Sequence, residues 1–189
     1  MSYSKLPILI VGTGGVARSL AIAIQKSGLQ IVGIVSRGGA DAVEFCSSNH
    51  LPLISYNTPI KERSICIIAV PDSAIVTVLK NLKINPTSIV LHTAGSVGAS
   101  VLEEYAENYG VFYPLQTFHP STIADYSKVN VCLEGNNDNT RDEIHKFAQL
   151  LTSHIYFLDS KQRLTLHLSA VFACNYSNLM YSVSYKLLS

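Results

Sequence analysis

The feature that most constrains this chain is a glycine-rich turn near its N-terminus. Residues 6–11 form a nearly continuous apolar run, as expected of a strand buried on both faces, and residues 16–27 have apolar side chains at helical spacing. Between these segments lies the pattern Gly12-x-Gly14-x-x-Ala17. In this context the first glycine permits a tight turn, the second lets the backbone approach a pyrophosphate, and the small third residue lets the helix pack against the strand. The turn therefore predicts a dinucleotide site formed by Gly12, Thr13, Gly14, Gly15, Val16 and Ala17.

Strand-like and helix-like segments alternate along the first 115 residues. We expect strands at residues 6–11, 30–35, 53–55, 64–70, 88–92 and 111–113, and helices at residues 16–27, 40–48, 72–82 and 98–108. This alternation predicts an α/β fold with a Rossmann-type, doubly wound parallel sheet in residues 1–115.

After residue 115 the pattern changes. A strand at residues 128–133, a helix at residues 138–151 and a strand at residues 155–158 can extend the sheet through residue 158. From about residue 160 the pattern is helical to the last residue, so we expect residues 159–189 to begin a second, mainly helical domain. Because the sequence stops in mid-helix without a capping glycine or proline, we also expect part of that domain to be missing.

The end of the expected second strand bears on which dinucleotide is bound. An NAD site usually has Asp or Glu there to accept a hydrogen bond from the ribose 2′-hydroxyl, whereas this chain has Ser36 and Arg37. Arginine is a permanent cation that forms forked pairs with phosphate, so we expect NADP(H), with NAD(H) the less favoured cofactor. The next acid, Asp41, falls inside the following helix. The alternative is that Arg37 is an ordinary solvated loop residue.

Two later strand ends also carry candidate site residues, because ligands on open parallel sheets bind beyond the carboxyl ends of the strands. His92 ends the fifth strand, and an imidazole has an unperturbed pKa suited to general acid catalysis. We therefore name His92 as a candidate catalytic residue, together with Ser96. The alternative is that His92 only hydrogen-bonds within its own loop. The residues that we place beside the cofactor at these two strand ends are Val70, Pro71, Asp72, His92 and Thr93.

The composition argues against several other functional classes. Charged residues make up 14% of the chain and the formal net charge is +1, so we expect no nucleic-acid partner. The apolar runs are strand-sized, well short of the roughly 20 residues that span a bilayer, and no signal-peptide pattern occurs, so we expect no membrane partner. The four cysteines lie far apart without a CxxC pair, so we expect no metal site and a cytoplasmic location.

Several motifs in this order resemble a known family. They lie at residues 11–17, 35–37, 69–73, 92–96, 110–118 and 167–176. Together they resemble the NADP oxidoreductases in which a Rossmann-like domain precedes a helical DUF2520 domain. Those proteins are similar in plan to pyrroline-5-carboxylate reductase and the coenzyme F420-dependent NADP oxidoreductases. The resemblance implies an NADP-binding domain, a homodimer built through the helical domain, and a reductase activity on a substrate that it does not name.

A polar stripe runs along the expected terminal helix. At 100° per residue, Arg163, His167 and Asn178 lie within about 60° of one another. Because related reductases place substrate between the Rossmann domain and such a helix, we expect His167 to be a proton donor or substrate anchor, and Arg163 to pair with a substrate carboxylate. Asn175 lies about 80° from His167 and borders the same pocket. The alternative is a solvated face or a dimer contact.

Gln116 and His119, near the expected domain junction, are further substrate-binding candidates. The preferred function is an NADPH-dependent reductase of a small imine or carbonyl compound, in which the cofactor supplies hydride and His92 or His167 supplies a proton. The alternative is an NADP(H)-binding sensor or scaffold without turnover, because a fold does not fix a function and the sequence has no unmistakable acid–base pair.

Overall fold

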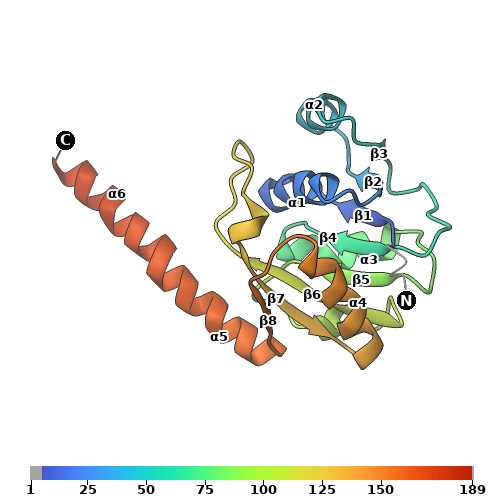
Figure 1. The fold of residues 1–189 in the computed structure, drawn as a ribbon. Helices are drawn as coiled ribbons and strands as arrows, with labels where there is room; N and C mark the ends of the chain where they lie inside the picture. Colours follow the sequence, from blue (N-terminus) through green and yellow to red (C-terminus); the bar gives the residue numbers. More distant parts are fainter. Residues whose placement is uncertain (1–5, 189) are drawn as a thin grey trace.

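One mixed sheet organises the chain, and the computed structural model describes residues 6–188 of it (Figure 1). The strand order is β3-β2-β1-β4-β5-β6-β7-β8, with β6 and β7 antiparallel and every other pair of neighbours parallel. The strands are β1 (Ile8–Val11), β2 (Ile31–Val35), β3 (Leu53–Ile54), β4 (Ile65–Ile68), β5 (Ile89–His92), β6 (Asn108–Leu115), β7 (Asn130–Gly135) and β8 (Ile155–Phe157). The predicted Rossmann-type α/β fold is confirmed, and the sheet continues through β8.

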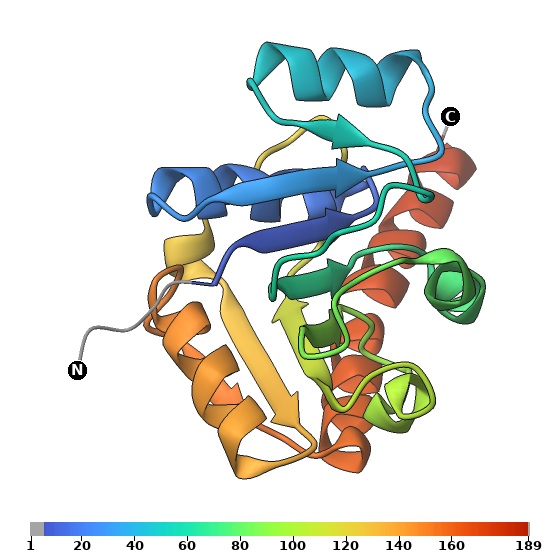
Figure 2. The ribbon, with the colours of Figure 1, turned by 90° about the vertical axis from the view of Figure 1, so that its right-hand side faces the viewer.

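Helices cover both faces of this sheet (Figures 1 and 2). The α-helices are α1 (Gly15–Lys26), α2 (Ala40–Ser48), α3 (Ile75–Asn81), α4 (Asp138–Gln149), α5 (Ser160–Ala170) and α6 (Ser177–Leu188). Single 3₁₀ turns occur at η1 (Asp72–Ala74), η2 (Ala99–Leu102) and η3 (Tyr126–Lys128), and a π-helical turn, η4 (Val171–Tyr176), joins α5 to α6. The expected helices over residues 16–27, 40–48, 72–82 and 138–151 are present, the third of them beginning with η1.

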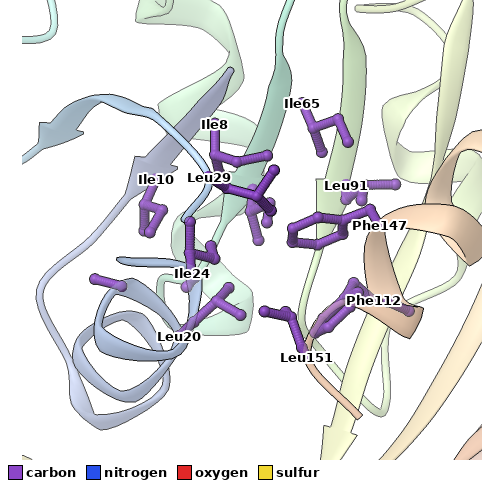
Figure 3. Close-up of a cluster of buried hydrophobic side chains, with 14 of the residues drawn as sticks. Ile8, Ile10, Leu20, Ile24, Leu29, Ile65, Leu91, Phe112, Phe147 and Leu151 are labelled. Carbon is purple, nitrogen blue, oxygen red and sulfur yellow. The ribbon is translucent and has the colours of Figure 1, made fainter. Parts of the chain in front are cut away.

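Strand side chains alternate between two cores because successive residues point to opposite faces of a sheet. In β1, Ile8 and Ile10 join a core with α1 and α4, whereas Leu9 and Val11 join a second core with α3 and η2. Figure 3 shows the first core, in which Leu20 and Ile24 of α1 face the same interior as Phe112 and Phe147. The rings of these two phenylalanines are 5.4 Å apart. Burial on both faces explains why β1 and β4 are uninterrupted apolar runs.

The structure corrects one expected helix. Residues 98–108 contain only η2, and β6 is longer than predicted, since it begins at Asn108. Only the last residue of the expected helix is in a strand: Asn108 begins β6, which pairs with β5 in parallel and with β7 in antiparallel register. Gly110 permits close approach of β7, because a Cβ atom there would collide with the Glu134 carbonyl.

The helices after β8 form an arm that projects from the body of the molecule (Figure 1). A 90° turn of the view shows the arm behind the sheet (Figure 2). Arg163 of α5 is buried, whereas all described residues of α6 are exposed. Large exposed apolar side chains on the arm include Leu168, Phe172, Leu179, Met180, Tyr181 and Val183. Within residues 6–188, no helix combines the length and the apolar character needed to cross a membrane.

Candidate functional site

A cleft of about 420 Å³ lies at the carboxyl ends of β1, β2, β4 and β5. Its lining residues are Gly12, Thr13, Gly14, Gly15, Val16, Ser36, Arg37, Gly38, Tyr56, Ala69, Val70, Pro71 and Thr93. Most residues that the sequence places beside a cofactor therefore line one cavity. Ala17 does not line it, because its side chain is buried in the core, as the packing role of the third motif position requires.

The two motif glycines have different physical roles. Gly12 has φ +116°, a conformation that disfavours any side chain, and a Cβ atom there would collide with the Ala69 carbonyl. Gly14 has φ −74° and is the N-cap of α1, and a Cβ atom there would meet nothing within 4 Å. Gly12 is thus required by the fold, whereas the missing side chain of Gly14 leaves the N-terminal amides of α1 open to the cleft. Amides of this kind bind phosphate groups, so the cradle fits a dinucleotide.

The far end of the cleft is formed by Arg37 and Tyr56. Arg37 is exposed at the rim, and the preceding Ser36 hydroxyl accepts a hydrogen bond of 3.3 Å from the Gly38 amide. Both residues line the cleft, and burial raises the pKa of Tyr56 while the charge of Arg37 acts in the opposite direction. The sequence analysis missed Tyr56. Its position just after β3 was the available signal, because that strand also ends at this edge of the sheet.

His92 is not a free imidazole, and the structure argues against it as a proton donor. Its ring is fully buried, with Nδ1 accepting from the Ala94 amide at 3.2 Å and Nε2 lying 3.3 Å from the Gly98 carbonyl. Burial and then the charge of Arg163 lower its pKa from 6.5 to about 4, although the bond to Gly98 and the charge of Asp72 oppose this shift. The alternative stated above, a histidine that stabilises its own loop, is what the structure supports.

Asp72 and Ser96 join the loops after β4 and β5. The Ser96 hydroxyl donates to the Asp72 carboxylate, and both residues are exposed. Neither lines the glycine-turn cleft. The serine therefore bridges two loops, and it lies outside both the glycine-turn cleft and the cavity at His167.

A second cavity, of about 480 Å³, lies between the end of β6 and the C-terminal arm. Its centre is a pair that the sequence analysis did not assemble: the Tyr113 hydroxyl lies 2.9 Å from His167 Nδ1, with the two rings edge-on. Burial raises the pKa of Tyr113 to about 12, so its hydroxyl stays protonated at neutral pH. Gly95 packs directly against both rings, because a Cβ atom there would collide with each of them. The cavity is lined by Tyr113, Leu115, Gln116, Thr117, His167, Ala170, Val171, Ala173, Cys174 and Asn175.

The π-helical turn changes which side of the arm faces this cavity. A π turn holds one residue more than an α turn, so side chains beyond it rotate relative to a 100° pattern. As a result Asn175 lines the cavity with His167, whereas Asn178 is exposed and lies outside it. The expected polar stripe through Asn178 was therefore wrong. Gln116, a substrate-binding candidate, also lines the cavity.

Arg163 and His119, the other two substrate-binding candidates, make their contacts outside the second cavity. Arg163 is 1% exposed, and its guanidinium donates to the Glu134 carboxylate and, at 2.5 Å, to the Val97 carbonyl. Its charge is therefore satisfied inside the protein, which corrects the expectation that it pairs with a substrate. His119 Nδ1 lies 2.7 Å from the Ser121 hydroxyl, and the His119 backbone packs against Gly15, so His119 lies beside the glycine turn. Among residues 6–188, no group of three His, Cys, Asp or Glu side chains could hold a metal ion.

Comparison with known proteins gives matches for both parts of the chain. Residues 1–120 match the Rossmann-like domain family, and residues 129–189 match DUF2520, a domain of unknown function. A solved putative NADP oxidoreductase from Bacteroides fragilis is 32% identical, with a TM-score of 0.86, over 99% of this chain and 73% of its own. A search of curated proteins finds no match.

Two more distant solved structures share the fold. A protein from Thermotoga maritima is 21% identical, with a TM-score of 0.75, over 96% of this chain and 71% of its own. A 1-pyrroline-5-carboxylate reductase from Streptococcus pyogenes is 16% identical, with a TM-score of 0.71, over 93% of this chain and 66% of its own.

Proposed function

Since this chain belongs to the Rossmann-like family and carries a DUF2520 match after that domain, we propose that it is an NADP(H)-dependent oxidoreductase acting on a small imine or carbonyl compound. The related Bacteroides protein is described as an NADP oxidoreductase, and a reductase of a cyclic imine shares the fold. The proposal requires a cofactor site and a substrate site that open toward each other.

One observation carries this proposal. Thr93 lines the glycine-turn cleft, and Gly95, two residues further on, packs against Tyr113 and His167 of the second cavity. A single short loop therefore separates the two cavities. A long cofactor anchored at the glycine turn would pass this loop and end beside the second cavity, which is where a reducible substrate is needed.

The residues of the cleft fit the parts of NADP(H). The N-terminal amides of α1 would hold the pyrophosphate, and the glycine turn has the open space beside Gly14 that this contact needs. Arg37 and Ser36 would hold the 2′-phosphate, and Tyr56 offers an aromatic face beside Arg37 for the adenine. When bound, the reduced nicotinamide supplies a hydride for an electrophilic carbon.

His167 would supply the matching proton. When the carbon of a C=N or C=O bond gains hydride, the electron pair of that bond moves to nitrogen or oxygen, which must then be protonated. Tyr113 holds Nδ1 of His167, which leaves Nε2 as the nitrogen that exchanges a proton with bound substrate. Gln116 and Asn175 line the same cavity and would orient the substrate by hydrogen bonds.

The activity is tested by NADPH oxidation against a panel of cyclic imines and 2-oxo acids, followed by absorbance. We expect turnover of at least one C=N or C=O compound. Tight NADPH binding without turnover across the panel would favour the sensor or scaffold. Sedimentation of the same sample tests the expected homodimer through the helical arm.

The cofactor is tested by the ratio of NADPH to NADH affinity in the wild type and in Arg37→Ala. We expect the wild type to favour NADPH and the variant to lose about tenfold of that preference, because a forked charged contact is removed. Lys61→Ala, which removes an exposed cation from the loop before β4, is the control. An unchanged ratio in Arg37→Ala would overturn the assignment of NADP(H) to this strand end.

A further inference from the structure

We propose that a second arginine, Arg18, sets the cofactor preference by holding the carboxylate of Asp41 away from the 2′-phosphate of NADP(H). This inference rests on the proposed NADP(H) binding and assigns a selectivity role to a pair that the motif does not include. Arg18 lies in the first turn of α1, and Asp41 in the first turn of α2. The two residues are 23 positions apart in sequence.

The contacts of Arg18 connect the glycine turn to α2. Its Nε donates to the Thr13 carbonyl at 2.8 Å, and a terminal nitrogen lies 2.5 Å from the Asp41 carboxylate. The same nitrogen lies 3.3 Å from the Asp41 carbonyl, and the guanidinium lies over the Phe45 ring, 4.9 Å from its centroid. The arginine side chain is only 11% exposed, so these contacts fix its position.

This geometry links an acid to the cofactor cleft through Arg18. Thr13 lines the cleft, and one guanidinium group reaches from its carbonyl to the Asp41 carboxylate. The loop between β2 and α2 is short: Gly38, at φ +87°, lines the cleft, Gly39 follows at φ +118°, and Asp41 lies three residues after Gly38. The Asp41 side chain is 83% exposed, and Asp41 follows Arg37, which lines the cleft, by only four residues in sequence.

An unpaired carboxylate at this place would favour the wrong cofactor. It would repel a 2′-phosphate and could accept a hydrogen bond from a 2′-hydroxyl, which is the role of the acid in NAD sites. The arginine side chain is a permanent cation, so its pairing with Asp41 offsets the local negative charge. The chain therefore has an acid in the first turn of the helix that follows β2, together with a cation that pairs with it.

The experiment must separate this electrostatic role from a structural one, because Arg18 also supports the glycine turn. Arg18→Met, Asp41→Asn and the double variant are compared by direct NADPH and NADH binding, measured by titration calorimetry. We expect Arg18→Met to weaken NADPH binding about tenfold while NADH binding weakens less. Asp41→Asn alone should change the ratio little. The double variant should recover most of the NADPH preference, because the repelling charge is gone.

A second pair of variants guards against loss of folding in Arg18→Met. Arg18→Gln keeps an amide donor for the Thr13 carbonyl but removes the charge, and it should show the same selective loss. Arg18→Lys keeps the charge and should keep the preference. Lys26→Met removes a cation from the last turn of the same helix, about 12 Å along its axis, and should have no effect.

Two results would overturn the inference. One is an equal loss of NADPH and NADH affinity in Arg18→Gln, which would show a purely structural role. The other is a double variant no better than Arg18→Met, which would show that Asp41 does not repel the phosphate. If the wild type itself shows no preference for NADPH, and Arg37→Ala changes nothing, the proposed cofactor fails instead. The two failures can therefore be told apart.

Discussion

The glycine-turn cleft and the Tyr113–His167 cavity lie on either side of one loop but are built in different ways. The cleft is formed largely by backbone at the ends of parallel strands. A side chain at Gly12 would collide with the Ala69 carbonyl, and one at Gly14 would occupy the open space beside α1. The second cavity is formed by side chains from β6, the following loop, α5 and the π-helical turn. A backbone cradle suits a ligand part common to many proteins, such as a pyrophosphate, whereas a side-chain cavity can be altered residue by residue to suit one substrate.

The histidines show the same contrast. His92 lies at a strand end, is buried, and hydrogen-bonds within its own loop, so its imidazole stabilises the frame of the site. His167 lies on the arm, is partly exposed, and shares a cavity with other polar side chains. The four predictions that follow test whether the glycine turn and the His92 loop have structural roles and whether the Tyr113–His167 cavity carries the reaction.

The largest effect is expected at the glycine turn. Gly12→Ala forces a side chain into the Ala69 carbonyl at a positive φ, so we expect the free energy of unfolding to fall by more than about 3 kcal/mol. Gly14→Ala is the matched variant: its side chain meets open space, so stability should change by less than about 0.5 kcal/mol while NADPH binding is lost. Urea unfolding and calorimetry measure the two quantities. Equal destabilisation by both substitutions would contradict the distinct roles.

His167→Gln tests the role proposed for the Tyr113–His167 cavity. Removing the proton donor should lower kcat about 100-fold with the NADPH dissociation constant unchanged, because the cavity lies apart from the glycine turn. Steady-state kinetics on the substrate found in the panel, and NADPH titration, measure these effects. Asn178→Ala, on the exposed side of the arm, is the control and should be silent. A variant with full kcat would remove His167 from the mechanism.

The pH dependence of stability tests the frame histidine. The pKa of His92 is about 4 in the folded protein and 6.5 when unperturbed, so the unfolded chain binds the extra proton between these values. The contribution of neutral His92 to the free energy of unfolding is therefore fully present above pH 6.5 and falls as the pH drops toward 4. The free energy of unfolding should decrease by about 2 kcal/mol between pH 7.5 and pH 5. Urea titrations at the two pH values give the difference for the wild type and for His92→Gln. We expect the substitution to remove most of it, and an unchanged difference would show that other groups cause it.

The smallest effect is expected at the π-helical turn. Asn175→Ala removes one orienting hydrogen bond, so KM for the substrate should rise about fivefold, equivalent to roughly 1 kcal/mol, with little change in kcat. The measurement is the KM and kcat pair under the same conditions as for His167→Gln. A larger fall in kcat than rise in KM would mean that Asn175 acts in the transition state.

The sequence was a good guide wherever function depends on neighbours along the chain. A strand, a glycine turn and a helix are contiguous, so the cleft and its Ser36–Arg37 rim could be identified from spacing alone. The helix expected over residues 98–108 is reduced to the 3₁₀ turn η2, and its last residue, Asn108, pairs with β5 as the start of β6. His92, a candidate proton donor, is instead buried with both ring nitrogens engaged within its own loop, which a single strand end does not reveal.

What the sequence by itself determined is the fold class and the cofactor cleft, because both follow from local backbone geometry and the alternation of apolar segments. Only the tertiary structure decided which side chains form the second cavity and the ion pairs around both sites. It brought Tyr113 to His167, assigned Arg163 to Glu134, paired Arg18 with Asp41, and rotated Asn175 into the cavity through a π-helical turn. Each of these outcomes depends on contacts between distant segments or on a change in helical pitch, and neither is encoded in a regular spacing of residue types.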